Sequence, residues 1–166
     1  MEKRIAVIVA TWFGSGLVPP IFLRGMAGTY GSLAALPVSY VLLYNAHGYI
    51  LTTLIVFTLG FWCIPIAEEE LGPRTDWRGK TKTRDQNQIV IDEVLGTLVA
   101  YSPLLFMPRN LLNMAAPFLL FRLFDIVKIF PAGYFDSRKS PAAIMFDDVV
   151  AGVYAAILIS IIFFIL

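Results

Sequence analysis

The charged residues of this chain lie in short segments between long apolar stretches, and this distribution restricts the fold more than any other feature. A helix that crosses a bilayer needs about 17–25 largely apolar residues. Several stretches here approach that length but are short or carry charges, which is typical of helices that are tilted or packed inside a bundle. The sequence therefore predicts an all-α fold, a small integral membrane helical bundle with about four to five membrane-embedded helices, some short or re-entrant. The apolar stretches are Ser32–Asn45, Ile50–Ala67, Ile89–Phe106, Leu111–Phe130 and Val149–Leu166.

Composition agrees with a membrane protein and excludes several other classes. Hydrophobic residues make up 58% of the 166 residues and charged residues only 15%. Soluble domains contain about 45–50% apolar residues and about 25% charged residues. The net charge of +1 gives no overall field that would attract nucleic acid. The single cysteine excludes an internal disulfide framework and a cysteine-rich zinc site. The length suits a single membrane-embedded domain over residues 1–166.

The first residues combine a basic start with an apolar run. Met1–Arg4 is basic and Ile5–Phe13 is apolar, a pattern that is also found in secretory signal peptides. No clear small-x-small cleavage site follows, so we expect residues 1–31 to form an interfacial or re-entrant N-terminal segment.

The positions of lysine and arginine predict the orientation. Five basic residues lie in 68–88 and two in 129–146. Two predicted spans separate these loops, so both emerge on one side, which the positive-inside rule makes the cytoplasm. All 12 Asp and Glu residues then lie at or near that face. The positive-inside rule does not require this clustering of acids, which therefore suggests a functional site.

Four sequence clusters meet at this face, and the first is the segment Gly28–Ser32. Its glycines permit close backbone approach, and free N–H groups at a helix start attract anions. Thr29 and Ser32 add hydroxyl groups. The alternative is a simple turn followed by a helix cap.

The second cluster is an adjacent pair of acids, Asp92 and Glu93, near the start of an apolar stretch. Such a pair is costly in a membrane unless it is paired or binds a metal. Asp85 precedes Asp92 by seven residues and would share its helical face if the helix extended that far. Gly96, one turn later, would leave room beside Asp92. The alternative is a salt bridge to a basic residue of the preceding loop.

The third cluster places Arg122, Asp125 and Lys128 three residues apart, so that they form a stripe on one helical face. Arginine can bind phosphate through two hydrogen bonds, and lysine adds a point charge. The alternative is a self-neutralising ladder within the helix. Asp136 follows in the loop.

The fourth cluster, Asp147 and Asp148, comes at the start of the last apolar stretch. Acids there suit the helix dipole, but two acids that face other acids repel each other unless a cation lies between them. By contrast, we expect the triple run Glu68–Glu70 to be a solvated interfacial face, with Glu70 a weak candidate ligand.

The chemistry that remains is rich in carboxylates and poor in histidine. The only histidine, His47, lies on the opposite face, and a nucleotide-binding Gly-x4-Gly-Lys-Ser/Thr motif is absent. Hard oxygen ligands favour Mg²⁺ over zinc, and Mg²⁺ together with arginine and lysine suits phosphoryl groups. The candidate metal ligands are Asp85, Asp92, Glu93, Asp136, Asp147 and Asp148.

These motifs, in this order, resemble the bacterial phosphatidylglycerophosphatase A family and cover most of the chain from Phe13 onward. The segments that carry the resemblance are Phe13–Gly16, Gly28–Pro37, Ile89–Gly96, Phe121–Pro131, Phe135–Asp136 and Ile144–Gly152. The resemblance implies a Mg²⁺-dependent phosphatase that converts phosphatidylglycerophosphate to phosphatidylglycerol and phosphate during phospholipid synthesis. It also implies a multi-pass protein of the bacterial inner membrane whose active site faces the cytoplasm.

On this basis the site residues are given roles. The attacking group is either a metal-activated water or an aspartate that forms a phosphoenzyme. The expected catalytic residues are Asp92, Glu93, Asp125 and Asp148. The expected phosphate-binding residues are Thr29, Ser32, Arg122 and Lys128.

Two other functions remain open from the sequence. A small ion or proton transporter would use intramembrane carboxylates, but it would spread them through the membrane depth. A non-catalytic lipid-binding membrane subunit would tolerate the loss of single acids and gives no reason for four converging clusters.

Overall fold

A computed structural model describes residues 1–19, 25–75, 79, 81–138 and 140–165 of the chain. Three of the predicted loop cations, Arg78, Lys80 and Lys139, lie outside the described residues, as do the side chains of Arg74 and Asp136.

The described residues form an all-α fold, as predicted, with one very short antiparallel hairpin. The hairpin consists of β1 (Arg74–Thr75) and β2 (Thr81–Lys82), with Thr75 opposite Thr81. Two 3₁₀ turns, η1 (Ser15–Leu17) and η3 (Ser102–Leu105), lie between helices. The α-helices are α1 (Glu2–Ala10), α2 (Ala27–Leu42), α3 (Ala46–Leu71), α4 (Ile91–Tyr101), α5 (Leu111–Val127), α6 (Ala132–Asp136) and α7 (Pro141–Ile165).

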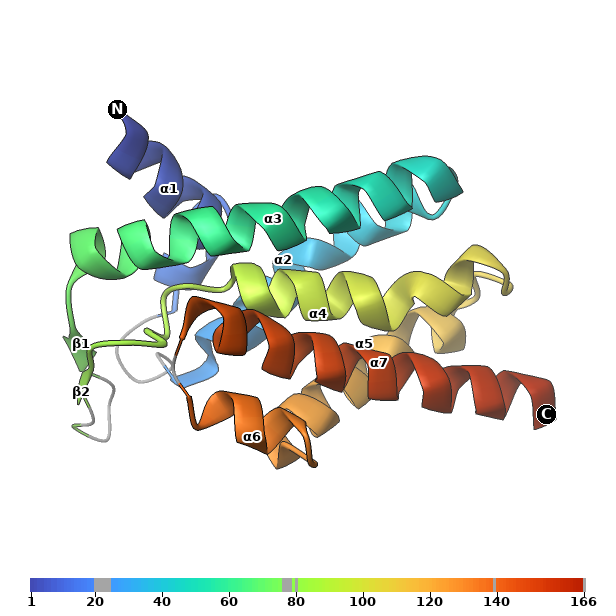
Figure 1. Ribbon diagram of the computed structural model, residues 1–166. Helices are drawn as coiled ribbons and strands as arrows, with labels where there is room; N and C mark the ends of the chain where they lie inside the picture. Colours follow the sequence, from blue (N-terminus) through green and yellow to red (C-terminus); the bar gives the residue numbers. More distant parts are fainter. Residues whose placement is uncertain (20–24, 76–78, 80, 139, 166) are drawn as a thin grey trace.

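The short helix α4 is the centre of the bundle, because it contacts α2, α3, α5 and α7. Nine of its eleven residues are buried. Figure 1 shows that α4 and α7 begin at the same end of the molecule as the hairpin and α6, whereas the C-terminus lies at the other end. The described parts of the predicted loops 68–88 and 129–146 therefore lie at one end of the bundle (Figure 1).

Several helix boundaries differ from the sequence-based expectation. Helix α2 begins inside the segment 1–31, and α3 continues into the predicted loop 68–88. The predicted loop 129–146 contains α6 and the first turn and a half of α7. The apolar stretches cover only part of these helices, because backbone hydrogen bonding continues into the polar residues next to them.

Glycines set the close contact between α4 and α7. A Cβ atom on Gly152 would lie 2.5 Å from the carbonyl oxygen of Gly96. A Cβ atom on Gly96 would lie 2.4 Å from the Phe121 ring and 2.8 Å from the carbonyl oxygen of Asp148. The space beside Gly96 is therefore filled by α5 and α7, and the sequence-based idea that it leaves room at Asp92 was wrong.

Two described helices, α3 and α7, are long and apolar enough to cross a membrane, with mean hydropathies of 2.1 and 2.4. Both expose large apolar side chains, which is typical of a surface that contacts lipid. In contrast, α4 is too short for a bilayer core of about 30 Å, because eleven residues rise only about 17 Å. Exposed examples are Ile50, Leu51, Leu54, Ile157, Ile161 and Phe164.

Asparagine caps start two helices at the end of the bundle away from the hairpin. The Asn110 side chain accepts a hydrogen bond of 2.8 Å from the Asn113 backbone N–H at the start of α5, and Asn45 caps α3 in the same way. Such a cap satisfies one of the free N–H groups of the first turn.

We expect Asn110→Ala to lower the free energy of unfolding by about 1 kcal/mol, because that N–H loses its acceptor. Thermal or denaturant unfolding in detergent micelles measures the change. Asn110→Ser keeps an acceptor and should behave like the unmodified chain, and equal destabilisation by both changes would contradict the cap assignment.

Candidate active site

A cavity of about 320 Å³ opens at the hairpin end of the bundle. Its walls come from the beginnings of α2, α4 and α7, the end of α5 and the loop after β2. Six carboxylates and three cations line it, so the lining carries an excess of negative charge. These residues are Asp85, Asp92, Glu93, Asp125, Asp147 and Asp148, with Lys82, Arg122 and Lys128.

Three of the acids converge most closely. Asp92, Glu93 and Asp148 each offer a carboxylate oxygen, and these oxygens lie within 4.8 Å of one another. Among the described residues, Asp92 Oδ1, Glu93 Oε2 and Asp148 Oδ2 are buried without a hydrogen-bond partner. Buried carboxylates that face one another are unfavourable unless a positive charge compensates them. Their oxygen donors suit a hard divalent cation such as Mg²⁺.

Local structure explains how these acids are held. Asp92 and Glu93 occupy the first turn of α4, where the helix dipole favours negative charge. The Val90 N–H just before this turn donates a hydrogen bond of 2.9 Å to the carbonyl oxygen of Ala10, which ties α4 to the N-terminal segment. A Cβ atom on Gly28 would lie 2.1 Å from Glu93 Oε1, so a larger residue there would push the Glu93 carboxylate out of its position.

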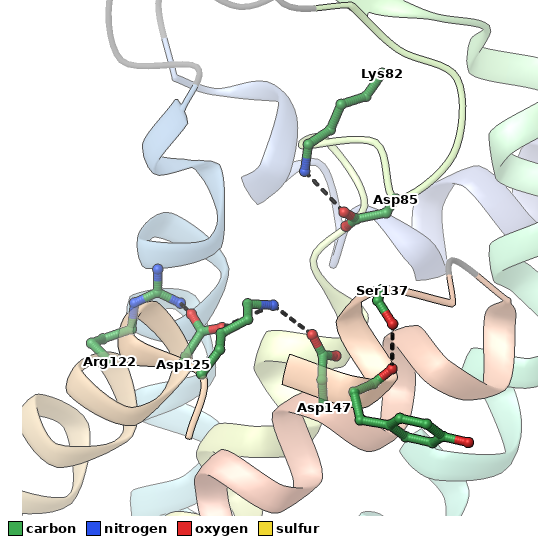
Figure 2. Close-up of polar contacts among 8 residues, drawn as sticks. Lys82, Asp85, Arg122, Asp125, Ser137 and Asp147 are labelled. Atoms are coloured by element: carbon green, nitrogen blue, oxygen red, sulfur yellow. Dashed lines mark hydrogen bonds and ion pairs between the residues drawn. The ribbon is translucent and has the colours of Figure 1, made fainter. Parts of the chain in front are cut away.

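The cationic side of the cavity comes from α5. Arg122 pairs with Asp125 at 2.7 Å (Figure 2). Lys128 lies 4.0 Å from Asp125 and donates a hydrogen bond of 2.5 Å to Asp147 Oδ2 on α7. The predicted row of charge pairs along one helix therefore exists on α5, and Lys128 also connects it to Asp147 on α7. Lys128 follows the last residue of α5 in a left-handed conformation, with φ of 49°.

A third cation enters from the loop. Lys82 pairs with Asp85 at 3.0 Å. The backbone N–H of Asp85 donates a hydrogen bond of 2.6 Å to Glu68 Oε1, and the Gln86 side-chain amide donates to the Glu68 carbonyl oxygen at 2.9 Å. Glu68, at the end of α3, thus fixes the loop that forms one wall of the cavity.

The structure brings most of the sequence-predicted site residues together. The exceptions are Thr29 and Ser32, which are not part of the cavity lining. Both lie within α2, and the buried Ser32 hydroxyl donates to the carbonyl oxygen of Gly28 at 2.9 Å. The side chain of Asp136 lies outside the described residues.

Three sequence-based expectations about local structure are modified by the structure. Asp85 does not extend the helix of Asp92, because α4 begins only at Ile91. Asp147 and Asp148 do not lie at the very start of the last helix, where the dipole would favour acids most, because α7 begins at Pro141 and they fall in its second turn. The glutamate run is not only a solvated face: Glu70 pairs with Lys3 at 3.1 Å, but Glu68 holds the cavity loop.

Sequence reasoning missed Glu68, Gln86 and Lys82 as residues that build the site. Lys82 was considered only as a neutralising partner. Spacing gave no signal for Glu68, since its contact with Asp85 joins residues 17 apart in the chain.

The arrangement combines a largely buried group of three carboxylates with arginine and lysine side chains around one cavity. Carboxylates alone would repel an anion. Together with a divalent cation and the positive charges of arginine and lysine, they can bind a phosphate group and stabilise negative charge that develops on it. The cavity can therefore support phosphoryl chemistry.

Comparisons with known proteins agree with this chemistry. The model of the family described as phosphatidylglycerophosphatase A matches residues 8–163. A phosphatidylglycerophosphatase A of Haemophilus influenzae is 32% identical over 155 residues, covering 92% of this chain and 85% of that protein. One of Escherichia coli is 32% identical over 152 residues, covering 90% and 78%.

A third relative carries a different name. A Bacteroides thetaiotaomicron protein named "Putative phosphatidylinositol-3-phosphatase" is 33% identical over 163 residues, covering 95% of this chain and 92% of that protein. No solved structure gave a significant match.

Proposed function

The chain belongs to the phosphatidylglycerophosphatase A family, and on this premise we propose that its acidic cavity removes the terminal phosphate of phosphatidylglycerophosphate with the aid of Mg²⁺. Water is added across the phosphomonoester bond, and the products are phosphatidylglycerol and inorganic phosphate. The observation that carries the metal requirement is the group of three carboxylates, from the buried Asp92 and Asp148 and the half-buried Glu93, whose oxygens lie within 4.8 Å of one another.

Asp92, Glu93 and Asp148 would hold the cation. These residues fit it because each has a buried carboxylate oxygen without a hydrogen-bond partner among the described residues. When bound, Mg²⁺ would offset most of this negative charge and polarise a phosphate oxygen. Asp85 and Asp147 line the same cavity, but they are engaged by Lys82 and Lys128.

The α5 cations would bind the phosphate to be released. Arg122 offers a fork of N–H donors that fits phosphate oxygens, and Asp125 orients that fork by its ion pair. Lys128 adds a second positive charge from the end of the same helix. Together they would offset the negative charge that grows on the phosphoryl oxygens during the reaction.

The position of the cavity suits a lipid substrate at the cytoplasmic surface of the bacterial inner membrane. The cavity lies at one end of a bundle that contains two helices able to cross a bilayer. Its volume of about 320 Å³ is near the lower limit for ligand pockets, enough for a headgroup but not for two acyl chains. The acyl chains would therefore stay in the bilayer beside the exposed apolar helices.

The gathering of the acids at one end also argues against a transporter. The uncharged run 149–166 forms most of α7, and 50–67 forms most of α3. A proton or ion path would need polar groups deeper along these helices.

We expect detergent-solubilised protein to release phosphate from phosphatidylglycerophosphate in the presence of Mg²⁺. In excess EDTA the rate should fall by a factor of at least about 100, and it should recover when Mg²⁺ is restored. Released phosphate is measured with equal bulk concentrations of phosphatidylglycerophosphate, phosphatidylinositol 3-phosphate and phosphatidic acid. Equal rates with and without the chelator would overturn the metal requirement. Preference for phosphatidylinositol 3-phosphate would overturn the substrate and favour the activity named for the Bacteroides relative.

A further inference from the structure

The cavity holds its cations in two separate places. Arg122 and Lys128 come from α5, whereas Lys82 comes from the hairpin. Figure 2 shows the Lys82–Asp85 pair apart from both the Arg122–Asp125 pair and Asp147. One phosphate bound by the α5 cations would therefore leave the Lys82 ammonium group for a different part of the ligand.

The Lys82 side chain is held in place rather than loosely exposed. Its side chain is 28% exposed, its ammonium group lies 3.0 Å from Asp85 Oδ2, and Asp85 is fixed through its backbone N–H by Glu68. An ammonium group has three N–H donors. Asp85 Oδ2 accepts one of them, which leaves donor capacity that a ligand in the cavity can use.

The substrate of the proposed function has a second anionic group within the same headgroup. In phosphatidylglycerophosphate, a glycerol unit joins the phosphomonoester to the phosphodiester of the lipid. The diester carries one negative charge and two free oxygens, which are acceptors that an ammonium group binds strongly. Neither product carries both groups: phosphatidylglycerol keeps only the diester, and inorganic phosphate comes only from the monoester.

We propose that Lys82 forms a second anion subsite that binds the phosphodiester of the substrate, and that Asp85 and Glu68 act as positioning residues for it. This inference rests on the proposed function and adds the residue that recognises the non-reacting part of the headgroup. The subsite distinguishes a headgroup with two phosphates from lipids with one, because only the former can engage both sets of cations.

The test compares Lys82→Ala and Lys82→Arg with the unmodified protein in mixed micelles with phosphatidylglycerophosphate. For Lys82→Ala we expect KM to rise about tenfold, which is the loss of one charge-assisted hydrogen bond, while kcat stays within about twofold. Inhibition by phosphatidylglycerol should weaken by a similar factor, and inhibition by inorganic phosphate should not change. Lys82→Arg keeps the charge and should restore most of the affinity.

Lys3→Ala is the matched control, because Lys3 forms a lysine–glutamate pair of 3.1 Å outside the cavity lining. It should leave KM and both inhibition constants unchanged. An unchanged KM in Lys82→Ala, an equal weakening of both inhibitors, or an unmodified protein that phosphatidylglycerol does not inhibit would each overturn the subsite. Absence of phosphatidylglycerophosphate hydrolysis by the unmodified protein would instead overturn the proposed function itself.

Discussion

Asp148→Asn and Asp92→Asn should each reduce the turnover of phosphatidylglycerophosphate by at least about a hundredfold, while the protein still inserts into the membrane. Each substitution keeps the shape of the side chain but removes one negative charge from the group that would hold Mg²⁺. Loss of one such electrostatic contact typically costs several kcal/mol of transition-state stabilisation. The measurement is phosphate release over a range of Mg²⁺ concentrations, which also reports weakened metal binding.

The same variants should not lose stability when Mg²⁺ is absent. Three carboxylates this close together repel one another without a cation, so removing one charge should keep or raise the unfolding temperature in EDTA. Glu70→Gln, at the exposed pair with Lys3, is the control and should retain full activity. Full activity of both aspartate variants would show that the metal assignment is wrong.

Gly152→Ala should cause the second large loss of activity, although Gly152 is not among the residues proposed to bind the substrate. Its Cβ atom would lie 2.5 Å from the Gly96 carbonyl oxygen and 3.0 Å from Val99 Cβ. A backbone oxygen inside a helix cannot turn aside, so α7 must shift away from α4. That shift separates Asp148 from Asp92, and misplacement of about 1 Å in a catalytic group can cost about a hundredfold in rate.

Activity and unfolding of Gly152→Ala are both measured in detergent, and overpacking of this kind costs about 1–3 kcal/mol of stability. Gly48→Ala is the control, because its Cβ atom would meet Asn45 only at an ordinary distance of 3.4 Å. A Gly152→Ala protein with unchanged activity would show that the α4–α7 contact does not set the carboxylate geometry.

The gathering of the acids could be predicted from the sequence because the placement of charges relative to apolar stretches indicates which residues share one end of a helical bundle. Asp92 and Asp148 lie at the same end of the molecule for that reason. Their closeness within that end depends on Gly96 and Gly152, whose contact joins two helices far apart in the sequence. The packing of Gly28 against Glu93 could not be predicted either, since it joins residues far apart in the sequence.

The start of α7 was missed although the chain carries a signal for it. Ser140 precedes Pro141, and its hydroxyl accepts a hydrogen bond of 3.1 Å from the Ala143 N–H. A serine cap followed by proline is a common helix start. The expectation followed the apolar stretch that begins at Val149 and so placed the start too late.

The segment Gly28–Ser32 was expected to bind the phosphate, because a glycine-rich segment before a helix often exposes its N–H groups. The hydroxyls of Thr29 and Ser32 would then add further donors. Here the segment is already helical, and Ser32 hydrogen-bonds within its own helix. The notion of an anion-binding turn therefore depended on a helix boundary that the sequence did not mark.

The size of the cavity has a consequence for how the enzyme acts in a membrane whose lipid tails change. A chamber of about 320 Å³ would enclose the charged end of the proposed lipid substrate and would leave its hydrocarbon tails among their neighbours. Shorter, longer or unsaturated tails would then present the same end to the protein. A bacterium that adjusts its fatty acids to temperature would not need to adapt this step of lipid synthesis to each new mixture.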